Sequence, residues 1–203
     1  MFTRSQLEAL DNLARSIDVD ARLPSGVFTR KFEEVYAMDF RHLKYPAAVE
    51  IFKLLMKEEG SSVVVLGRFD RPKKESQDWR DDVFFVSPTT QVDEYMTFLN
   101  RYRAEYGNRR ATPEMREPWH VFAERIGVCS NLGKWCIYGQ MTAEIAVLGS
   151  DMKPTIKLEE QLYSEFRIEK LAEALKRDTF FGEPGNEYST KQRAILRSAY
   201  LLH

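Results

Sequence analysis

Residues 133–149 constrain the fold more than any other stretch of the chain. Two runs of β-prone residues flank Gly139-Gln140, and a glycine stands at each end of the segment. Glycine at the first central position of a two-residue loop suits a type II′ turn, whose twist matches that of paired strands. The sequence therefore predicts a β-hairpin that turns at Gly139-Gln140.

Side chains alternate along a strand, so this hairpin would have two distinct faces. The first is predicted to belong to the core and carries Cys136, Tyr138, Met141, Ala143, Ile145 and Val147. The second is predicted to be mixed and carries Trp135, Ile137, Thr142, Glu144, Ala146 and Leu148. With this turn, Glu144 would lie opposite Trp135. Two interpretations of its carboxylate stay open: a charge that discourages strand aggregation, or a polar anchor in a binding cleft.

Apolar periodicity predicts the remaining elements. Residues 63–69 and 83–86 are short apolar runs typical of neighbouring strands. Helical spacing of apolar residues, together with capping residues, Pro or Gly at the ends, predicts seven helices. Five of them begin near Ser5, Ser25, Pro46, Thr90 and Pro118. Two more follow Pro154, one around Ile168 and one from Ser189. The strands come in pairs rather than in alternation with crossover helices, so the predicted class is α+β. We expect a small, mainly antiparallel sheet of about four strands packed with six to seven helices, in a single domain over residues 1–203.

Bulk composition narrows the possible partners. The chain has 203 residues, of which 30% are charged and 43% hydrophobic, and its formal net charge is −1. This balance gives no argument for a strongly basic nucleic-acid binder or for an acidic tail. Charged residues begin at Arg4, too early for a signal peptide, and no apolar run reaches the roughly 18 to 20 residues of a membrane span. The sequence therefore predicts a cytoplasmic protein with no membrane partner.

Motifs for common chemistries are missing from the sequence. It has no phosphate loop ending in Gly-Lys-Ser/Thr, no GxGxxG fingerprint, no HExxH and no GxSxG. His42, His120 and His203 are far apart in sequence, whereas catalytic zinc usually needs clustered histidines. We therefore expect no cofactor, no bound metal and no small-molecule substrate.

The two cysteines, Cys129 and Cys136, do not form a CxxC pair. Cys136 is predicted to be a small buried hydrophobic residue. A disulfide with Cys129 across the intervening turn is the alternative interpretation.

The polar segment 70–82 joins two predicted strands and is long and charged for a simple connection. Trp79 lies within it among charged residues, where the pattern requires no core side chain. Because tryptophan is enriched in binding hot spots, Trp79 is predicted to contact a partner together with Asp78, Asp81 and Asp82. A tryptophan folded back over the adjacent strands is the alternative.

One basic and aromatic cluster contains Arg101, Tyr102, Arg103, Tyr106, Arg109 and Arg110. Cationic side chains interleaved with rings can bind a nucleic-acid backbone and stack on its bases. Tyr102 and Tyr106 fall, however, on the apolar stripe of the predicted helix, which favours a core role for the rings and a solvated face for the arginines. Nucleic acid is therefore not the expected partner.

The predicted hairpin also resembles a pattern in bacterial immunity proteins of toxin-based competition systems. There, a Trp-x-hydrophobic-aromatic strand precedes a strand of the type Glu-hydrophobic-x-hydrophobic-hydrophobic-Gly. The matching segments are Gly133-Lys134-Trp135-Cys136-Ile137-Tyr138-Gly139 and Ala143-Glu144-Ile145-Ala146-Val147-Leu148-Gly149. The resemblance implies a small cytoplasmic α+β domain that binds and neutralises a cognate toxin, with no cofactor and no catalysis of its own.

Together these features predict a non-enzymatic protein-binding domain, and the resemblance implies an immunity protein whose partner is an intracellular toxin. The residues predicted to contact that partner are Trp79, Asp78, Asp81, Asp82, Glu144 and Trp135. Paired acidic residues could complement a basic toxin and stand at Glu33-Glu34, Glu58-Glu59, Asp81-Asp82 and Glu159-Glu160. Two alternatives remain: a small enzyme using His120 and Glu144 as acid and base, and a nucleic-acid accessory protein using the arginine cluster.

Overall fold

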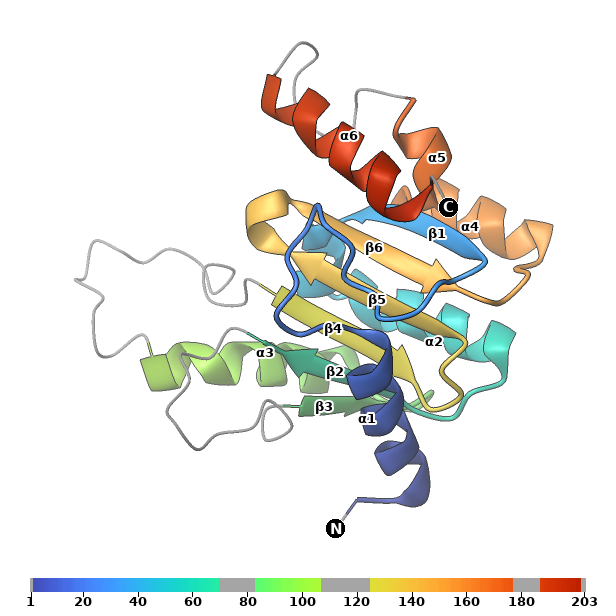
Figure 1. Cartoon of the computed structure of the whole chain (residues 1–203). Coiled ribbons are helices and arrows are strands. Elements are labelled where there is room, and N and C mark those ends of the chain that lie inside the picture. The colour runs from blue at the N-terminus through green and yellow to red at the C-terminus, as the bar shows by residue number, and fades with distance from the viewer. Residues whose placement is uncertain (1, 70–82, 107–124, 177–186, 202–203) are drawn as a thin grey trace.

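Seven strands form one antiparallel sheet in the described part of this computed structural model, which covers residues 2–69, 83–106, 125–176 and 187–201. The strands are β1 (Glu34–Asp39), β2 (Val64–Arg68), β3 (Val83–Val86), β4 (Arg125–Ser130), β5 (Trp135–Gln140), β6 (Ile145–Ser150) and β7 (Glu169–Lys170). They lie in the order β3-β2-β4-β5-β6-β1-β7 (Figure 1). The consecutive strands β4, β5 and β6 form a meander in the middle of this sheet.

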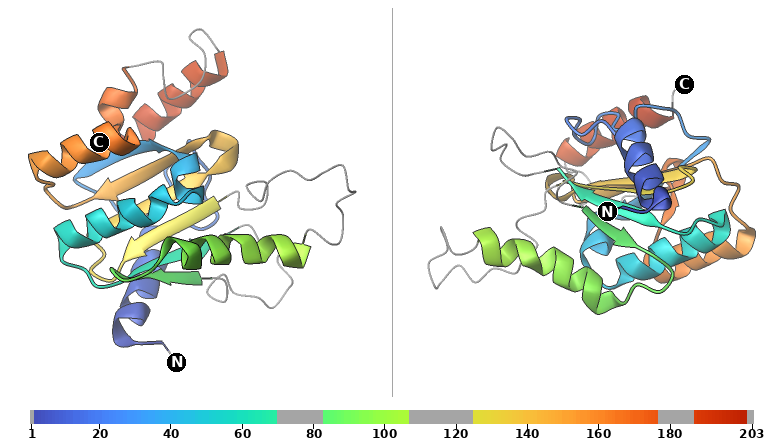
Figure 2. Two further views of the ribbon diagram at one scale, coloured as in Figure 1. Left: turned by 180° about the vertical axis from the view of Figure 1, so that it is seen from behind. Right: turned by 90° about the horizontal axis from the view of Figure 1, so that it is seen from below.

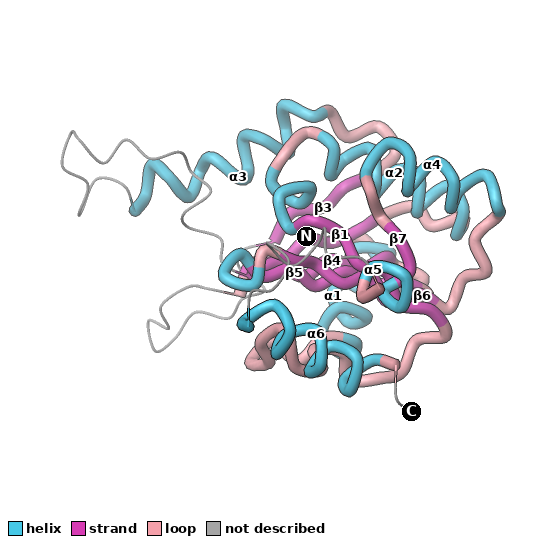
Figure 3. The backbone as a smooth tube through the Cα atoms, turned by 90° about the horizontal axis from the view of Figure 1, so that it is seen from above, coloured by secondary structure: helices cyan, strands magenta, loops and turns pink. Residues whose placement is uncertain are grey.

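Helices cover both faces of the sheet (Figure 2 and Figure 3). One face carries α2 (Ala47–Glu59), α3 (Val92–Tyr106) and α4 (Ile156–Phe166). The other carries α1 (Arg4–Ser16), α5 (Leu171–Ala174) and α6 (Glu187–Tyr200). Two 3-10 helices, η1 (Phe40–Lys44) and η5 (Met141–Ala143), follow β1 and β5. Across the described residues, no helix combines the length and the apolar character that crossing a membrane requires.

Both faces of the central meander are core. Every residue of β4, β5 and β6 is buried. Cys136, Tyr138, Ile145 and Val147 share the α1 face, as the sequence predicts. The second hairpin face was expected to be mixed, but its strand residues Trp135, Ile137, Ala146 and Leu148 are buried under α2, α3 and α4. Because helices cover both sides, these strands are apolar on both sides, which accounts for their continuous apolar runs.

The hairpin expected at residues 133–149 forms, but its predicted two-residue loop is wrong. Gln140 is opposite Ile145, and the connection is the β5–β6 turn, residues 141–144. Gly139 is a strand residue: a Cβ built on it would lie 2.6 Å from side-chain atoms of both Leu43 and Phe40. This glycine therefore makes room for a side chain above the strand instead of forming a turn. Lengthening the loop by an even number of residues preserves which residues share a face.

The longer loop also overturns the predicted pairing of Glu144 with Trp135. Trp135 lies opposite Ser150 in the actual register. Glu144 is in the turn, with φ of 54°, at the far end of β5.

The expectation of about four strands is wrong, since the described residues contain seven. The spacing of Phe28, Phe32, Val35 and Tyr36 predicted a helix, yet the segment runs into β1, which pairs with β6 and β7. The helix expected from Pro118 to Gly127 begins outside the described residues, and its end lies in β4. Short apolar runs fit either period, and here pairing with distant strands decided the outcome.

Several helix ends follow local signals. Pro46 immediately precedes α2, and Gly60 ends it with φ of 78°. The predicted capping box at the first helix exists two residues earlier than expected, between Thr3 and Gln6. The helix α4, capped by Thr155, was not predicted.

Cys129 and Cys136 are opposed residues of β4 and β5 and form a disulfide. Their Cα atoms are 4.4 Å apart, within the range that a disulfide spans. Both residues are fully buried on the α1 face. The predicted burial of Cys136 is therefore confirmed, and the alternative interpretation, a disulfide with Cys129, is the one that the structure has.

Candidate functional site

The β4–β5 turn, residues 131–134, is a meeting point of distant segments. Asn12 of α1 donates from Nδ2 to the carbonyl oxygens of Ser130 and Asn131, at 3.3 and 3.0 Å. The Oδ1 atom of Asn131 accepts from two successive backbone N–H groups just before β2, at 3.0 and 3.1 Å. Side-chain bonds therefore tie this turn both to α1 and to the start of β2.

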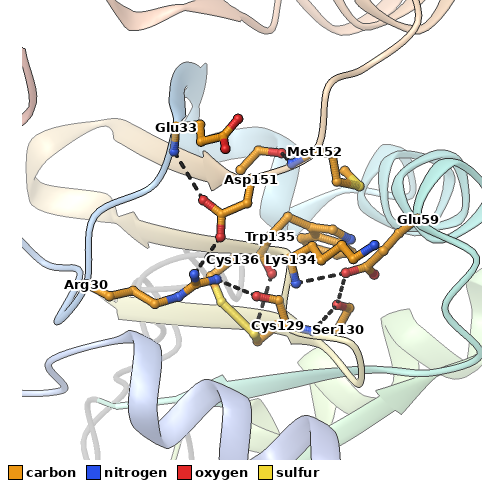
Figure 4. A network of polar contacts seen from close by, with 12 residues as sticks. Arg30, Glu33, Glu59, Cys129, Ser130, Lys134, Trp135, Cys136, Asp151 and Met152 are labelled. Atoms are coloured by element: carbon orange, nitrogen blue, oxygen red, sulfur yellow. Dashed lines mark hydrogen bonds and ion pairs between the residues drawn. A yellow bond between two sulfur atoms is a disulfide. The ribbon is translucent and has the colours of Figure 1, made fainter.

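Glu59, the last residue of α2, reaches the same turn. Its Oε1 accepts from the Ser130 hydroxyl at 2.8 Å and from the Lys134 N–H at 2.9 Å (Figure 4). Its Oε2 is buried and has no hydrogen-bond partner among the described residues. A carboxylate only accepts hydrogen bonds, and a buried acceptor without a donor is costly. The second oxygen of Glu59 is thus a buried acceptor without a donor among the described residues.

Arg30 and Asp151 hold the other side of the turn (Figure 4). Arg30 donates from Nη1 to Asp151 and from Nη2 to the carbonyl of Gly133, both at 2.5 Å. Asp151 also accepts from the backbone N–H of Glu33 at 3.1 Å. The guanidinium carbon lies 4.0 Å from the ring centroid of Phe32. Charge-assisted bonds of this kind are short and directional, so they fix the carboxylate of Asp151 in place.

A surface hollow of about 350 Å³ lies beside this turn. It is lined by Glu58, Glu59, Lys134, Asp151, Met152 and Lys153. Glu58 also accepts from the N–H of Thr155, at 2.8 Å, where α4 begins. The lining thus carries three carboxylates and two ammonium groups, and the carboxylate of Asp151 is also paired with Arg30.

The lining of the hollow consists of charged side chains and one methionine. No Ser, Cys or His side chain lines the hollow, so it lacks the paired nucleophile and base of covalent catalysis. Within the ranges that the structure describes, no three His, Cys, Asp or Glu residues are grouped as metal ligands. The arrangement therefore supports a binding site for a charged partner.

The opposite end of the sheet carries a second charged group. Arg41 donates from Nε to Oδ2 of Asp39 at 2.8 Å. Burial acts to raise the pKa of Asp39, but hydrogen bonds from the side chain and backbone of Arg41 outweigh it, so this pKa is lowered. Burial lowers the pKa of His42, which is half-buried in η1. Glu144 is exposed in the β5–β6 turn.

Two of the six residues predicted to contact a partner lie in the described part of the chain, and they are not brought together. Trp135 is completely buried, and its Nε1 has no hydrogen-bond partner among the described residues. Burial removes it from the surface that a partner could contact. Glu144 remains exposed, at the other end of β5.

The other predicted residues fall elsewhere. Trp79, Asp78, Asp81 and Asp82 lie outside the described residues, as do His120, Arg109 and Arg110. Arg101 and Arg103 belong to α3, but their side chains are not described.

Sequence reasoning missed the β4–β5 turn as a site. Its signal was present, because Ser130-Asn131-Leu132-Gly133 is typical of a turn. A helix was predicted where β4 lies, so these residues were not recognised as a turn between two strands. The partners of the turn are distant in sequence: Asn12 is 118 residues from Ser130, and Glu59 is 71 residues from it. Local spacing does not reveal such pairs.

Comparison with known proteins adds no relative to this picture. No protein-family model, no curated protein and no solved structure matches the chain.

Proposed function

We propose that this chain is a non-enzymatic protein-binding domain that neutralises a cognate toxin in the cytoplasm. The observation that carries the proposal is the β5–β6 hairpin, whose residues resemble those of immunity proteins. Its two strands are neighbours in the middle of the sheet, and both are buried on both faces. A resemblance on such a segment concerns the fold, so the partner surface is to be sought among exposed residues.

The hollow beside the β4–β5 turn is the surface that supports this proposal best. Glu58, Glu59 and Asp151 supply three carboxylates there. Complementary charge speeds association and selects partners. The proposed partner is therefore a basic toxin that inserts a lysine or arginine side chain into the hollow.

Co-expression tests the proposal. The gene of this chain is expressed in a bacterial host with each reading frame that adjoins it in its genome. We expect one of these frames to arrest growth alone, and the chain to restore growth and form a complex with its product that calorimetry detects. If a toxic neighbour binds the chain with no gain in growth, or if no neighbour is toxic, the proposal is wrong.

Two charge reversals on α2 then locate the surface. Glu58→Lys alters the hollow, whereas Glu50→Lys alters an exposed residue about 12 Å away along the same helix. We expect Glu58→Lys to weaken toxin binding at least about tenfold, equivalent to about 1.4 kcal/mol, and Glu50→Lys to leave it nearly unchanged. Equal effects of the two variants would place the contact elsewhere.

A further inference from the structure

The disulfide between Cys129 and Cys136 lies at the base of the β4–β5 turn (Figure 4). It joins directly opposed residues of β4 and β5 and closes a loop that contains the whole turn. Ser130, which follows Cys129, and Lys134, two residues before Cys136, both donate to Glu59. The disulfide is therefore close to the residues that line the hollow, so a change in its redox state can affect them.

Helix α1 covers the disulfide. Ala9, Leu10 and Leu13 of α1 are buried in the same apolar cluster as Cys129 and Cys136. Figure 1 shows α1 crossing the sheet near the end of β4. The two hydrogen bonds from Asn12 to the turn hold the helix at this place. Helix, turn and disulfide thus form one packed unit.

A cytoplasmic location and the burial of both sulfurs together point to a regulatory role for this disulfide. Disulfides are rare in the cytosol, where those that occur are usually transient and catalytic or redox-sensing. We propose that the Cys129–Cys136 bond is a redox-sensitive switch whose reduction loosens α1 and the β4–β5 turn. The proposal rests on the cytoplasmic location that the proposed function assumes.

The physical cause is the space that sulfur atoms require. Two non-bonded sulfurs need a larger separation than two bonded ones, and this pair is fully buried in a close-packed layer. Reduction therefore forces a neighbour to move. The strands are fixed by their ladder of hydrogen bonds, so α1 and the turn are the elements that shift.

The chemical step is an exchange with a cellular dithiol. A thiolate of the dithiol attacks one cysteine sulfur and breaks the S–S bond, and its second thiol then displaces that sulfur from the mixed disulfide. The chain gains two electrons and two protons as two thiols, and the reductant becomes a disulfide. Because both sulfurs are buried, local opening of α1 must precede attack.

Hydrogen exchange on the folded wild-type chain tests the switch. The chain, isolated under air, is alkylated before and after incubation with dithiothreitol under native conditions, and thiols are counted by mass spectrometry. We expect no alkylated cysteine before and two after reduction. We also expect amides of α1 and of the β4–β5 turn to exchange at least about tenfold faster after reduction, amides of α3 to be unchanged, and reoxidation to restore the original rates.

A variant without thiols provides the control. Cys129→Ala/Cys136→Ala has no sulfur atoms that must separate, so its exchange in α1 should not respond to dithiothreitol. Three results overturn the proposal: thiols in the chain as isolated, resistance to dithiothreitol until the chain is denatured, or reduction that leaves exchange in α1 unchanged. No toxin takes part in this experiment, so its failure and the failure of the proposed function are distinguishable.

Discussion

The two turns of the β4-β5-β6 meander lie at opposite ends of β5 and are held in different ways. The β4–β5 turn is bound by side chains from distant elements: Asn12, Arg30 and Glu59 all reach it. The β5–β6 turn has a local hydrogen bond from the N–H of Glu144 to Met141 at 2.8 Å, with Glu144 in the left-handed region. Its ties to other elements come from η1 alone among those described: Phe40 donates its N–H to the carbonyl of Glu144 at 3.3 Å, and Lys44 contacts the sulfur of Met141.

The difference between the two turns shows where charged side chains from several elements come together. Side chains that arrive at a turn from several elements bring fixed carboxylates and cations into one place, which is what a recognition site needs. No carboxylate or guanidinium from another element is bonded to the described residues of the β5–β6 turn, and the carboxylate of Glu144 is exposed to solvent. The first turn is therefore a candidate site, and the second is a connection.

The largest effect is expected next to the β5–β6 turn, in the core. Ile145 is almost completely buried in the α1-face cluster. Ile145→Ala should lower the free energy of unfolding by about 2–5 kcal/mol, through lost burial and the cavity left behind. Chemical denaturation measures this change. Greater damage from Glu144→Ala would show that the register of β6 is not the one described.

A pair of carboxylate deletions compares the two turns directly. Glu59→Ala leaves the Ser130 hydroxyl and the Lys134 N–H without their acceptor, so we expect a loss of about 1–3 kcal/mol. Glu144→Ala removes an exposed side chain and should change stability by less than about 0.5 kcal/mol. The midpoints of urea denaturation test both values. Similar losses would mean that the two turns are held alike.

A glycine placed in the second turn should act in the opposite direction. Glu144 has φ of 54°, a region that costs L-residues energy and glycine none. Glycine also adds conformational entropy to the unfolded chain, which offsets part of this gain. The net effect of Glu144→Gly should be an increase in the free energy of unfolding of about 0.5 kcal/mol. Thermal melts compare it with Glu144→Ala, which keeps the backbone cost. A lower melting temperature for Glu144→Gly would contradict a turn held by local conformation.

The smallest effect is a dependence on pH at the η1 end. Burial lowers the pKa of His42, so the unfolded chain binds a proton more readily than the folded one. Stability should be full above the unfolded histidine value, about 6.5, and should fall as the pH drops through it. Because the pKa of Asp39 is also lowered, its contribution is lost at more acidic pH.

A variant separates these two groups. His42→Gln should flatten the melting temperature between neutral and mildly acidic pH and leave the acidic decline that Asp39 causes. An unchanged slope in this variant would assign the neutral-range dependence to another group.

Short-range signals were sufficient for some elements. Pro46 and Gly60 delimit α2 because the ring of proline and the left-handed backbone of glycine act within a few residues. The strands β2 and β3 were predicted as neighbours from their apolar runs, and they pair antiparallel. The placement of Cys136, Tyr138, Ile145 and Val147 on one face of the hairpin also followed from alternation alone.

Long-range pairing decided the rest. The strand β1 is set by β6, more than 100 residues away, and its residues have a spacing that equally suits a helix. The loop at residues 141–144 replaced the expected glycine turn because Phe40 and Leu43 pack over Gly139.

The sequence by itself determined the α+β class, several helix ends and the facing of the central hairpin, since these depend on residues a few positions apart. Only the tertiary structure decided that the sheet has seven strands in the described residues, that Trp135 is core, and that Glu59, Arg30 and Asp151 meet at one turn. Those outcomes depend on contacts between segments far apart in the chain, which local periodicity does not encode.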